Sequence, residues 1–145
     1  MANVERRAHV VWEGDLMGNG TLTGKDSEVL NEVSVTFASR TQHPEGKTSP
    51  EELIASAHAT CYAMALSNTL AEQDAPPASL EIDAVCTLDD EALKITTVDL
   101  DVRGNVPGMN EEEFENAARQ AEQSCPVSNA LRNNVEIRVN ARLEG

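Results

Sequence analysis

The chain is expected to fold as a single α+β domain, residues 1–145, with a mostly antiparallel sheet, a long buried central helix and helices on one face. Three observations predict this. Several segments alternate between apolar and polar residues as strands do. An Ala-rich segment from Thr48 to Ser67 carries strong helix signals, and turn residues join the neighbouring strand segments.

The long helix has a well-marked beginning. Ser49 is a good N-cap residue and Pro50 falls at the first helical position, where its missing N–H has no cost. Glu52 follows Ser49 by three residues and completes a capping box, and Glu51 adds a second negative charge to the first turn. The helix should end near residue 72 or 73, before two prolines.

This helix is uncharged over most of its length. No Lys, Arg, Asp or Glu occurs between Leu53 and Ala71, and a helix that is apolar nearly all round is a buried one. Cys61 should therefore lie in the interior, with His58 one turn before it. One sheet in a chain of this size covers only one side of such a helix, so a homodimer is the economical explanation.

The other elements follow from periodicity and turn signals. Strands are expected at Arg7–Glu13, Thr21–Thr23 and Val33–Ser39 before the long helix, and at Leu80–Leu88, Leu93–Val106 and Val135–Leu143 after it. Between the last two strands, Asn110 and Glu113 form a capping box for a helix to about Gln123. A short helix should then run from Cys125-Pro126 to Leu131.

Charge and composition limit the partners of the chain. The formal net charge is −14, with 25 acidic and 11 basic residues, which argues against nucleic acid and against an anionic membrane surface as partners. No segment resembles a signal peptide or a transmembrane helix. Three cysteines without an export signal indicate a reducing cytoplasm, where cysteines are more often catalytic, metal-binding or inert than disulfide-bonded.

The three cysteines differ in their settings. Cys86 lies on the inward face of an alternating strand and fits a small buried residue. Cys125 stands at a helix N-terminus, where unpaired N–H groups and the helix dipole would favour its thiolate. Cys61 fits a core residue when taken alone, and His58 fits a buried core histidine equally well.

Two arrangements would give Cys61 a chemical role. If Arg40 folds over the beginning of the long helix, Glu51 could hold its guanidinium in a bidentate pair, and the guanidinium could lower the pKa of a nearby buried thiol. Alternatively, His58, Cys61 and Cys125 could bind a metal, although the sequence has no CxxC motif and no obvious fourth ligand.

Three motifs together resemble the OsmC-like family of osmotically inducible peroxidases. They are VVWEGDL near the start, TSPEELIASAHATCYAMALS in the long helix and CPVSNAL about sixty residues later, in the family's order. The AHATCYAMALS form is similar to the OsmC branch rather than the organic hydroperoxide resistance (Ohr) branch. The resemblance implies a thiol peroxidase without haem, flavin or metal, and an intertwined homodimer with its active sites at the subunit interface.

The resemblance also assigns roles to residues. Cys61 matches the peroxidatic cysteine and Cys125 the resolving cysteine. Arg40, placed at the end of the predicted FASR strand, matches the arginine that activates the thiol, and Glu51 matches the glutamate that holds this arginine. Arginine and cysteine are expected to come from different subunits. The family thus assigns the attack to Cys61, whereas the helix terminus alone would favour Cys125 as the more acidic thiol.

The implied reaction is the reduction of hydroperoxides. Cys61 would become a sulfenic acid and condense with Cys125 to a disulfide, which an external dithiol, either a small thiol or a lipoyl-type protein, would reduce. Apolar surroundings favour organic hydroperoxides over hydrogen peroxide, and the cellular role would be defence against oxidative or osmotic stress. A metal-binding module and a non-catalytic stress protein of the same fold remain as alternatives.

Overall fold

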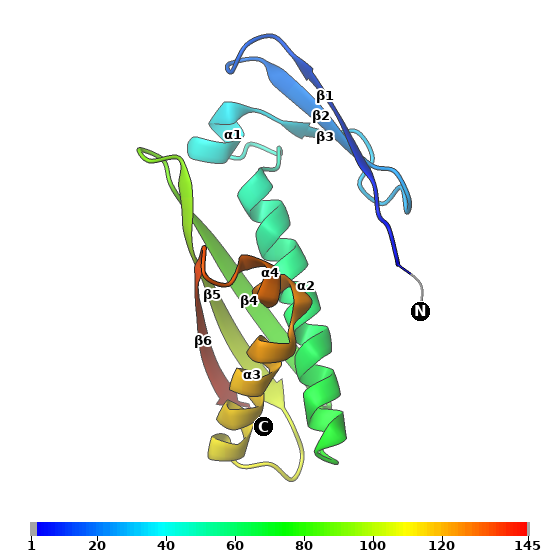
Figure 1. Ribbon diagram of the computed structural model, residues 1–145, viewed down its shortest axis with the longest axis vertical. Coiled ribbons are helices and arrows are strands. Elements are labelled where there is room, and N and C mark those ends of the chain that lie inside the picture. The colour runs from blue at the N-terminus through cyan, green and yellow to red at the C-terminus, as the bar shows by residue number, and fades with distance from the viewer. Residues whose placement is uncertain (1–2, 145) are drawn as a thin grey trace. The chain divides into compact units, whose positions relative to one another are not determined.

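The computed structural model describes residues 3–144, which form two compact units. The N-terminal unit extends to Leu53 and the C-terminal unit begins at Ile54. Helix α2, Pro50–Glu72, begins in the first unit and continues into the second. Figure 1 shows the order of the elements along the chain.

The N-terminal unit is a small antiparallel sheet followed by a short helix. Its strands are β1 (Ala8–Glu13), β2 (Asn19–Gly24) and β3 (Val33–Val35), in the order β1-β2-β3. The helix is α1, Phe37–Thr41. Every residue of β1 is exposed, including the apolar side chains of Val10, Val11 and Trp12, so this sheet buries little apolar surface in the single chain.

The expectation of a strand to Ser39 is wrong, because the strand ends at Val35 and helix α1 begins at Phe37. The reason is a capping box. The Thr36 side chain accepts from the N–H of Ser39 at 3.0 Å, and the Ser39 side chain accepts from the N–H of Thr36 at 2.9 Å. Arg40 therefore lies on a helix and does not close a strand.

The C-terminal unit contains a second sheet with the order β4-β5-β6. Strands β4 (Ser79–Asp89) and β5 (Lys94–Asn105) form an antiparallel hairpin, whereas β6 (Glu136–Leu143) runs parallel to β5. The parallel pairing follows from the crossover between them, which contains α3 (Glu111–Ser124) and α4 (Pro126–Leu131). The fold is α+β as expected, with one antiparallel and one mixed sheet.

The core of this unit joins the sheet to helices α2 and α3. Most of its buried residues come from three elements: Tyr62, Leu66 and Leu70 of α2, Val98, Leu100 and Val102 of β5, and Phe114, Ala117 and Ala121 of α3. Close approach is essential at one point. A Cβ atom on Gly104 would lie 2.5 Å from the Phe114 ring, so only glycine leaves room for this ring.

Helix α2 is buried on one side only within the single chain. His58, Tyr62 and Leu66 are fully buried, whereas Ala57 and Thr60 are exposed and Met64 has 68% of its surface exposed. The expected burial on most sides is therefore not present in one chain, because the C-terminal sheet covers one side of the helix.

The predicted helix beginnings are present. The Ser49 side chain accepts from the N–H of Glu52 at 3.1 Å. Asn110 and Glu113 form the complete capping box of α3, with hydrogen bonds of 2.8 and 2.9 Å. Within residues 3–144, no helix is long and apolar enough to cross a membrane.

Candidate functional site

Two cysteines of the C-terminal unit lie side by side. Cys61, in the middle of α2, and Cys125, at the N-cap of α4, have their sulfur atoms 3.4 Å apart, and both are thiols. Cys125 is fully buried and Cys61 is half-buried. A disulfide needs a sulfur–sulfur distance of about 2.05 Å, so a small movement would join the two. The two thiols are therefore close enough for a disulfide to form between them.

The beginning of α4 points toward Cys61. Pro126 occupies the first turn of this helix, and the backbone N–H of Val127 hydrogen-bonds to the Cys61 thiol. Cys125 makes no side-chain capping hydrogen bond, although it is the N-cap residue. The N–H group of Val127 at this helix terminus thus acts on Cys61, an influence that the sequence did not predict.

Opposing influences act on the Cys61 thiol. Burial raises its pKa, because the thiolate loses contact with water, and the adjacent Cys125 raises it further. The hydrogen bond from the Val127 N–H lowers the pKa, but burial is the stronger influence. A reactive thiolate at this position therefore requires a further stabilising group, such as a positive charge.

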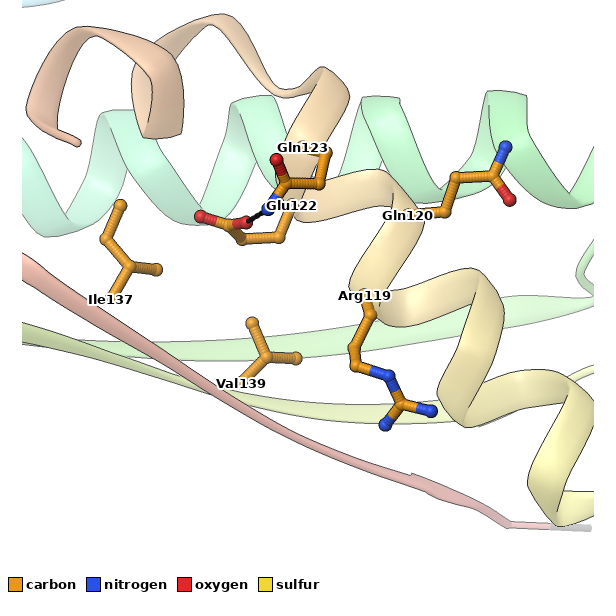
Figure 2. A pocket seen from close by; sticks show the side chains of 6 residues that line it. All are labelled: Arg119, Gln120, Glu122, Gln123, Ile137 and Val139. Atoms are coloured by element: carbon orange, nitrogen blue, oxygen red, sulfur yellow. Dashed lines mark hydrogen bonds between the residues drawn. The ribbon is translucent and has the colours of Figure 1, made fainter.

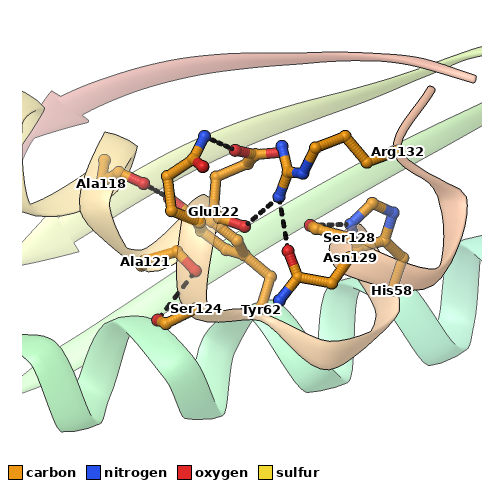
Figure 3. Close-up of polar contacts among 10 residues, drawn as sticks. His58, Tyr62, Ala118, Ala121, Glu122, Ser124, Ser128, Asn129 and Arg132 are labelled. Atoms are coloured by element: carbon orange, nitrogen blue, oxygen red, sulfur yellow. Dashed lines mark hydrogen bonds and ion pairs between the residues drawn. The ribbon is translucent and has the colours of Figure 1, made fainter.

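Next to the cysteines, His58 and Ser128 form a buried hydrogen bond, drawn in Figure 3. His58 Nε2 and Ser128 Oγ are 2.7 Å apart, and both residues are fully buried. The other ring nitrogen, Nδ1, is buried without a hydrogen-bond partner. Burial lowers the pKa of His58, while the charge of Glu122 acts in the opposite direction. The imidazole is therefore held in its neutral form.

The other end of α4 is attached to α3 by an ion pair, also visible in Figure 3. Arg132 Nη1 lies 2.6 Å from Glu122 Oε1, and Nη2 donates to the Glu122 carbonyl oxygen at 3.0 Å and to Asn129 Oδ1 at 2.8 Å. This pair was not predicted from the sequence. A signal was present, because Glu122 falls on the apolar stripe of α3, which also contains Phe114 and Ala118.

In the N-terminal unit, Arg40 and Glu51 form a bidentate ion pair. Arg40 Nε donates to Glu51 Oε1 at 3.0 Å, and Nη2 donates to Oε2 at 2.9 Å. The hydrogen bond to Glu51 raises the pKa of Arg40, and the Glu51 carboxylate is buried. The structure thus joins Arg40 with Glu51 within one unit and Cys61 with Cys125 within the other.

A groove between α3 and β6 does not include the two cysteines. It has a volume of about 460 Å³ and is lined by polar side chains of α3 and apolar ones of β6, as Figure 2 shows: Arg119, Gln120, Glu122, Gln123, Ile137 and Val139. Within residues 3–144, no three His, Cys, Asp or Glu side chains are arranged to hold a metal ion, so the metal-binding alternative has no ligand set there.

The known proteins that resemble this chain are OsmC-like and organic hydroperoxide resistance proteins. The family model described as OsmC-like protein matches residues 42–140. Peroxiredoxin OsmC of Escherichia coli K12 is 36% identical over 137 residues, which cover 92% of this chain and 94% of that protein. Organic hydroperoxide resistance protein-like 2 of Staphylococcus epidermidis is 25% identical over 140 residues, covering 91% and 96%.

Solved structures share the fold. The crystal structure of the organic hydroperoxide resistance protein OhrB of Bacillus subtilis superimposes with a TM-score of 0.72 at 26% identity, covering 94% of this chain and 98% of that one. The OsmC-like protein of Mycoplasma pneumoniae superimposes with a TM-score of 0.76 at 15% identity, covering 99% and 100%.

Proposed function

The chain belongs to the OsmC-like family, and from this membership we propose that it reduces organic hydroperoxides to alcohols through a disulfide between Cys61 and Cys125. It is an oxidoreductase of the thiol peroxidase class, like the peroxiredoxin and the hydroperoxide resistance proteins that it resembles. The single observation that carries the proposed mechanism is the 3.4 Å distance between the two sulfur atoms.

The proposed reaction has three steps. The Cys61 thiolate attacks the terminal oxygen of the hydroperoxide, the O–O bond breaks, and the alkoxide takes up a proton and leaves as an alcohol. Cys61 is then a sulfenic acid, and the Cys125 sulfur attacks the Cys61 sulfur with loss of water. An external dithiol, either a small thiol or a lipoyl-type protein, reduces the resulting disulfide by thiol–disulfide exchange. Hydrogen peroxide would react by the same steps, more weakly.

Exposure supports Cys61 as the attacking residue. Cys61 is half-buried, whereas Cys125 has 0% of its surface exposed, so a peroxide reaches Cys61 first. The Val127 N–H also stabilises negative charge on Cys61. Cys125 then resolves the sulfenic acid from its buried position beside it.

The proposal assigns activation of Cys61 to Arg40, contributed by the second subunit of an intertwined homodimer. Because burial raises the pKa of Cys61, a cation near its sulfur is needed to populate the thiolate. Glu51 would hold the guanidinium of Arg40 in a fixed orientation. The dimer is supported by apolar surface that one chain leaves uncovered, namely Met64 of α2 and the apolar side chains of β1.

The proposed setting is the cytoplasm, where reduced thiols are maintained, and the proposed role is defence against oxidative or osmotic stress. Cys125 belongs to the apolar core of the C-terminal unit, and Cys61 packs against this core. Burial of an alkyl group against such surface would favour organic hydroperoxides.

The experiment that tests this function is a count of thiols before and after one equivalent of cumene hydroperoxide, followed by peptide mapping. We expect two thiols to disappear, the disulfide to map to Cys61 and Cys125, and a dithiol to reverse it. Cys86→Ser should behave like the unmodified chain and serves as the control. Survival of all three thiols would refute the proposal.

The variant Cys125→Ser separates the two roles. It should still consume one equivalent of peroxide, but Cys61 should then remain a sulfenic acid or be oxidised further. Unchanged steady-state turnover with a dithiol would remove Cys125 from the mechanism.

A further inference from the structure

Three inward-facing residues of α2, His58, Cys61 and Tyr62, each contact the helices that follow β5. His58 contacts Ser128 of α4, Cys61 contacts Cys125 at the beginning of α4, and the Tyr62 hydroxyl donates to the carbonyl oxygen of Ala118 in α3 at 2.7 Å. One face of α2 therefore holds both following helices. The proposed reaction uses only the middle contact, so the role of the His58 contact remains to be explained.

The hydrogen bonds of His58 argue against a direct role in proton transfer. Its Nε2 is engaged with Ser128, and its Nδ1 has no hydrogen-bond partner, so neither nitrogen hydrogen-bonds to the Cys61 sulfur. A general base must be within hydrogen-bond reach of the proton that it removes. The position of His58 one turn before Cys61 must therefore serve another purpose.

The direction of the hydrogen bond follows from the unpartnered nitrogen. If Nε2 accepted from Ser128, the proton would be on Nδ1, which would then be a buried N–H donor without an acceptor. If Nε2 carries the proton, Nδ1 is instead a buried acceptor without a donor, and unsatisfied buried acceptors are more common than unsatisfied buried donors. We therefore assign the proton to Nε2, which donates to Ser128 Oγ at 2.7 Å. This assignment makes glutamine, whose amide nitrogen can also donate, a meaningful replacement.

Helix α4 depends on such contacts for its position. It has only six residues, too few to be stable alone. Arg132, directly after its last residue, is attached to Glu122 of α3, and Ser128, in its middle, is attached to His58 of α2. Ser128 directly follows Val127, whose N–H meets the Cys61 thiol, and it comes three residues after Cys125.

We propose that His58 is a positioning residue, whose hydrogen bond to Ser128 holds α4 so that the Val127 N–H and the Cys125 sulfur both meet the sulfur of Cys61. This inference rests on the proposed peroxidase function and deepens it. The contact acts at two stages of the reaction. It keeps an N–H donor on the attacking thiolate, and it keeps the resolving sulfur close enough to trap the sulfenic acid before a second peroxide does.

The test compares variants at both ends of the contact with a matched control. His58→Leu and Ser128→Ala each remove the hydrogen bond, the double variant removes both partners, and His58→Gln retains a donor. Tyr62→Phe is the control, because it removes a buried hydrogen bond of the same helix to α3 and leaves the hydrogen bond between His58 and Ser128 in place. Circular dichroism checks folding, and Ser128→Ala carries the test alone if His58→Leu does not fold.

Two readouts are measured on each protein. The first is the ratio of sulfinic acid at Cys61 to the Cys61–Cys125 disulfide after cumene hydroperoxide, determined by mass spectrometry. We expect this ratio to rise about fivefold in Ser128→Ala and His58→Leu, the factor that corresponds to one typical hydrogen bond. The double variant should match the single ones, since all three lose the same contact. His58→Gln and Tyr62→Phe should resemble the unmodified chain.

The second readout needs no peroxide. The pH midpoint of Cys61 alkylation by iodoacetamide should move upward in Ser128→Ala and stay in place in Tyr62→Phe. An unmoved midpoint together with an unchanged ratio in Ser128→Ala would overturn the positioning role, as would equal effects in Tyr62→Phe. If the unmodified chain forms no disulfide after cumene hydroperoxide, the proposed function is overturned instead. The alkylation midpoint would still test whether His58 positions α4.

Discussion

The ion pair between Glu122 and Arg132 leads to a prediction with a definite asymmetry. The Glu122 side chain has 10% of its surface exposed and the Arg132 side chain 30%. Arg132→Met would leave a buried carboxylate without its cation and would remove a donor from the Glu122 carbonyl oxygen. Glu122→Gln would retain an acceptor oxygen, and the guanidinium could turn toward water.

The expected magnitudes follow from this difference. Removal of one partner of a fully buried pair costs about 3–5 kcal/mol, and the partial exposure of Arg132 reduces this to about 2–4 kcal/mol for Arg132→Met. Glu122→Gln should cost about 1 kcal/mol, the contribution of one hydrogen bond. Removing the more exposed partner should therefore destabilise the protein more than neutralising the buried one.

Urea unfolding at a fixed protein concentration measures both changes. With an m-value of about 2 kcal/mol per molar, the midpoint of Arg132→Met should fall by about 1–2 M. Arg119→Met is the control, because Arg119 lies exposed on α3 and its hydrogen bond is to the exposed Asn116. If Arg132→Met destabilises the protein no more than Glu122→Gln does, the reasoning from the buried carboxylate is refuted.

Three further predictions concern Cys61, His58 and Gly104. Arg40→Met should raise the pH midpoint of Cys61 alkylation, since burial then acts on the thiol without the proposed cation; an unmoved midpoint would separate Arg40 from Cys61. Burial lowers the pKa of His58, so its stabilising effect should be complete above a pH of about 6.5, the unfolded value, and be lost as the pH falls toward the lowered pKa. His58→Gln should lose this part of the pH dependence of the urea midpoint, and parallel pH curves would contradict it. Gly104→Ala should cost about 1–3 kcal/mol in thermal unfolding, because its Cβ would meet the Phe114 ring, and Phe114→Leu should recover part of this loss.

Much of the fold could be predicted from the sequence, because its signals were local. The beginning of α2 at Pro50 and the capping box of α3 depend on residues within three positions of each other. The strand prediction for Val33–Ser39 is wrong because the alternating pattern gives way at Thr36 to a capping box with Ser39, which is an equally local signal. The parallel β6 could have been predicted from the long crossover that precedes it.

The surroundings of the candidate site were less accessible to sequence reasoning. Cys61, Cys125 and His58 could be singled out by residue type and motif. Ser128 and the Val127 N–H could not, because they meet their partners across 64 or more positions and carry no distinctive local pattern. Which of two thiols receives a helix-terminal N–H depends on the orientation of α4, and that orientation is fixed by tertiary contacts.

The two adjacent cysteines have a thermodynamic consequence as well as a chemical one. They are 64 positions apart in the chain, so a bond between them closes a large loop and restricts the unfolded chain. The chain-entropy relation gives about 4 kcal/mol of stabilisation for a loop of this length. Each turnover would thus carry the molecule from a looser reduced form to a more heat-resistant oxidised form. Its melting temperature would therefore depend on the fraction of molecules that peroxide has oxidised and that a reductant has not yet reduced.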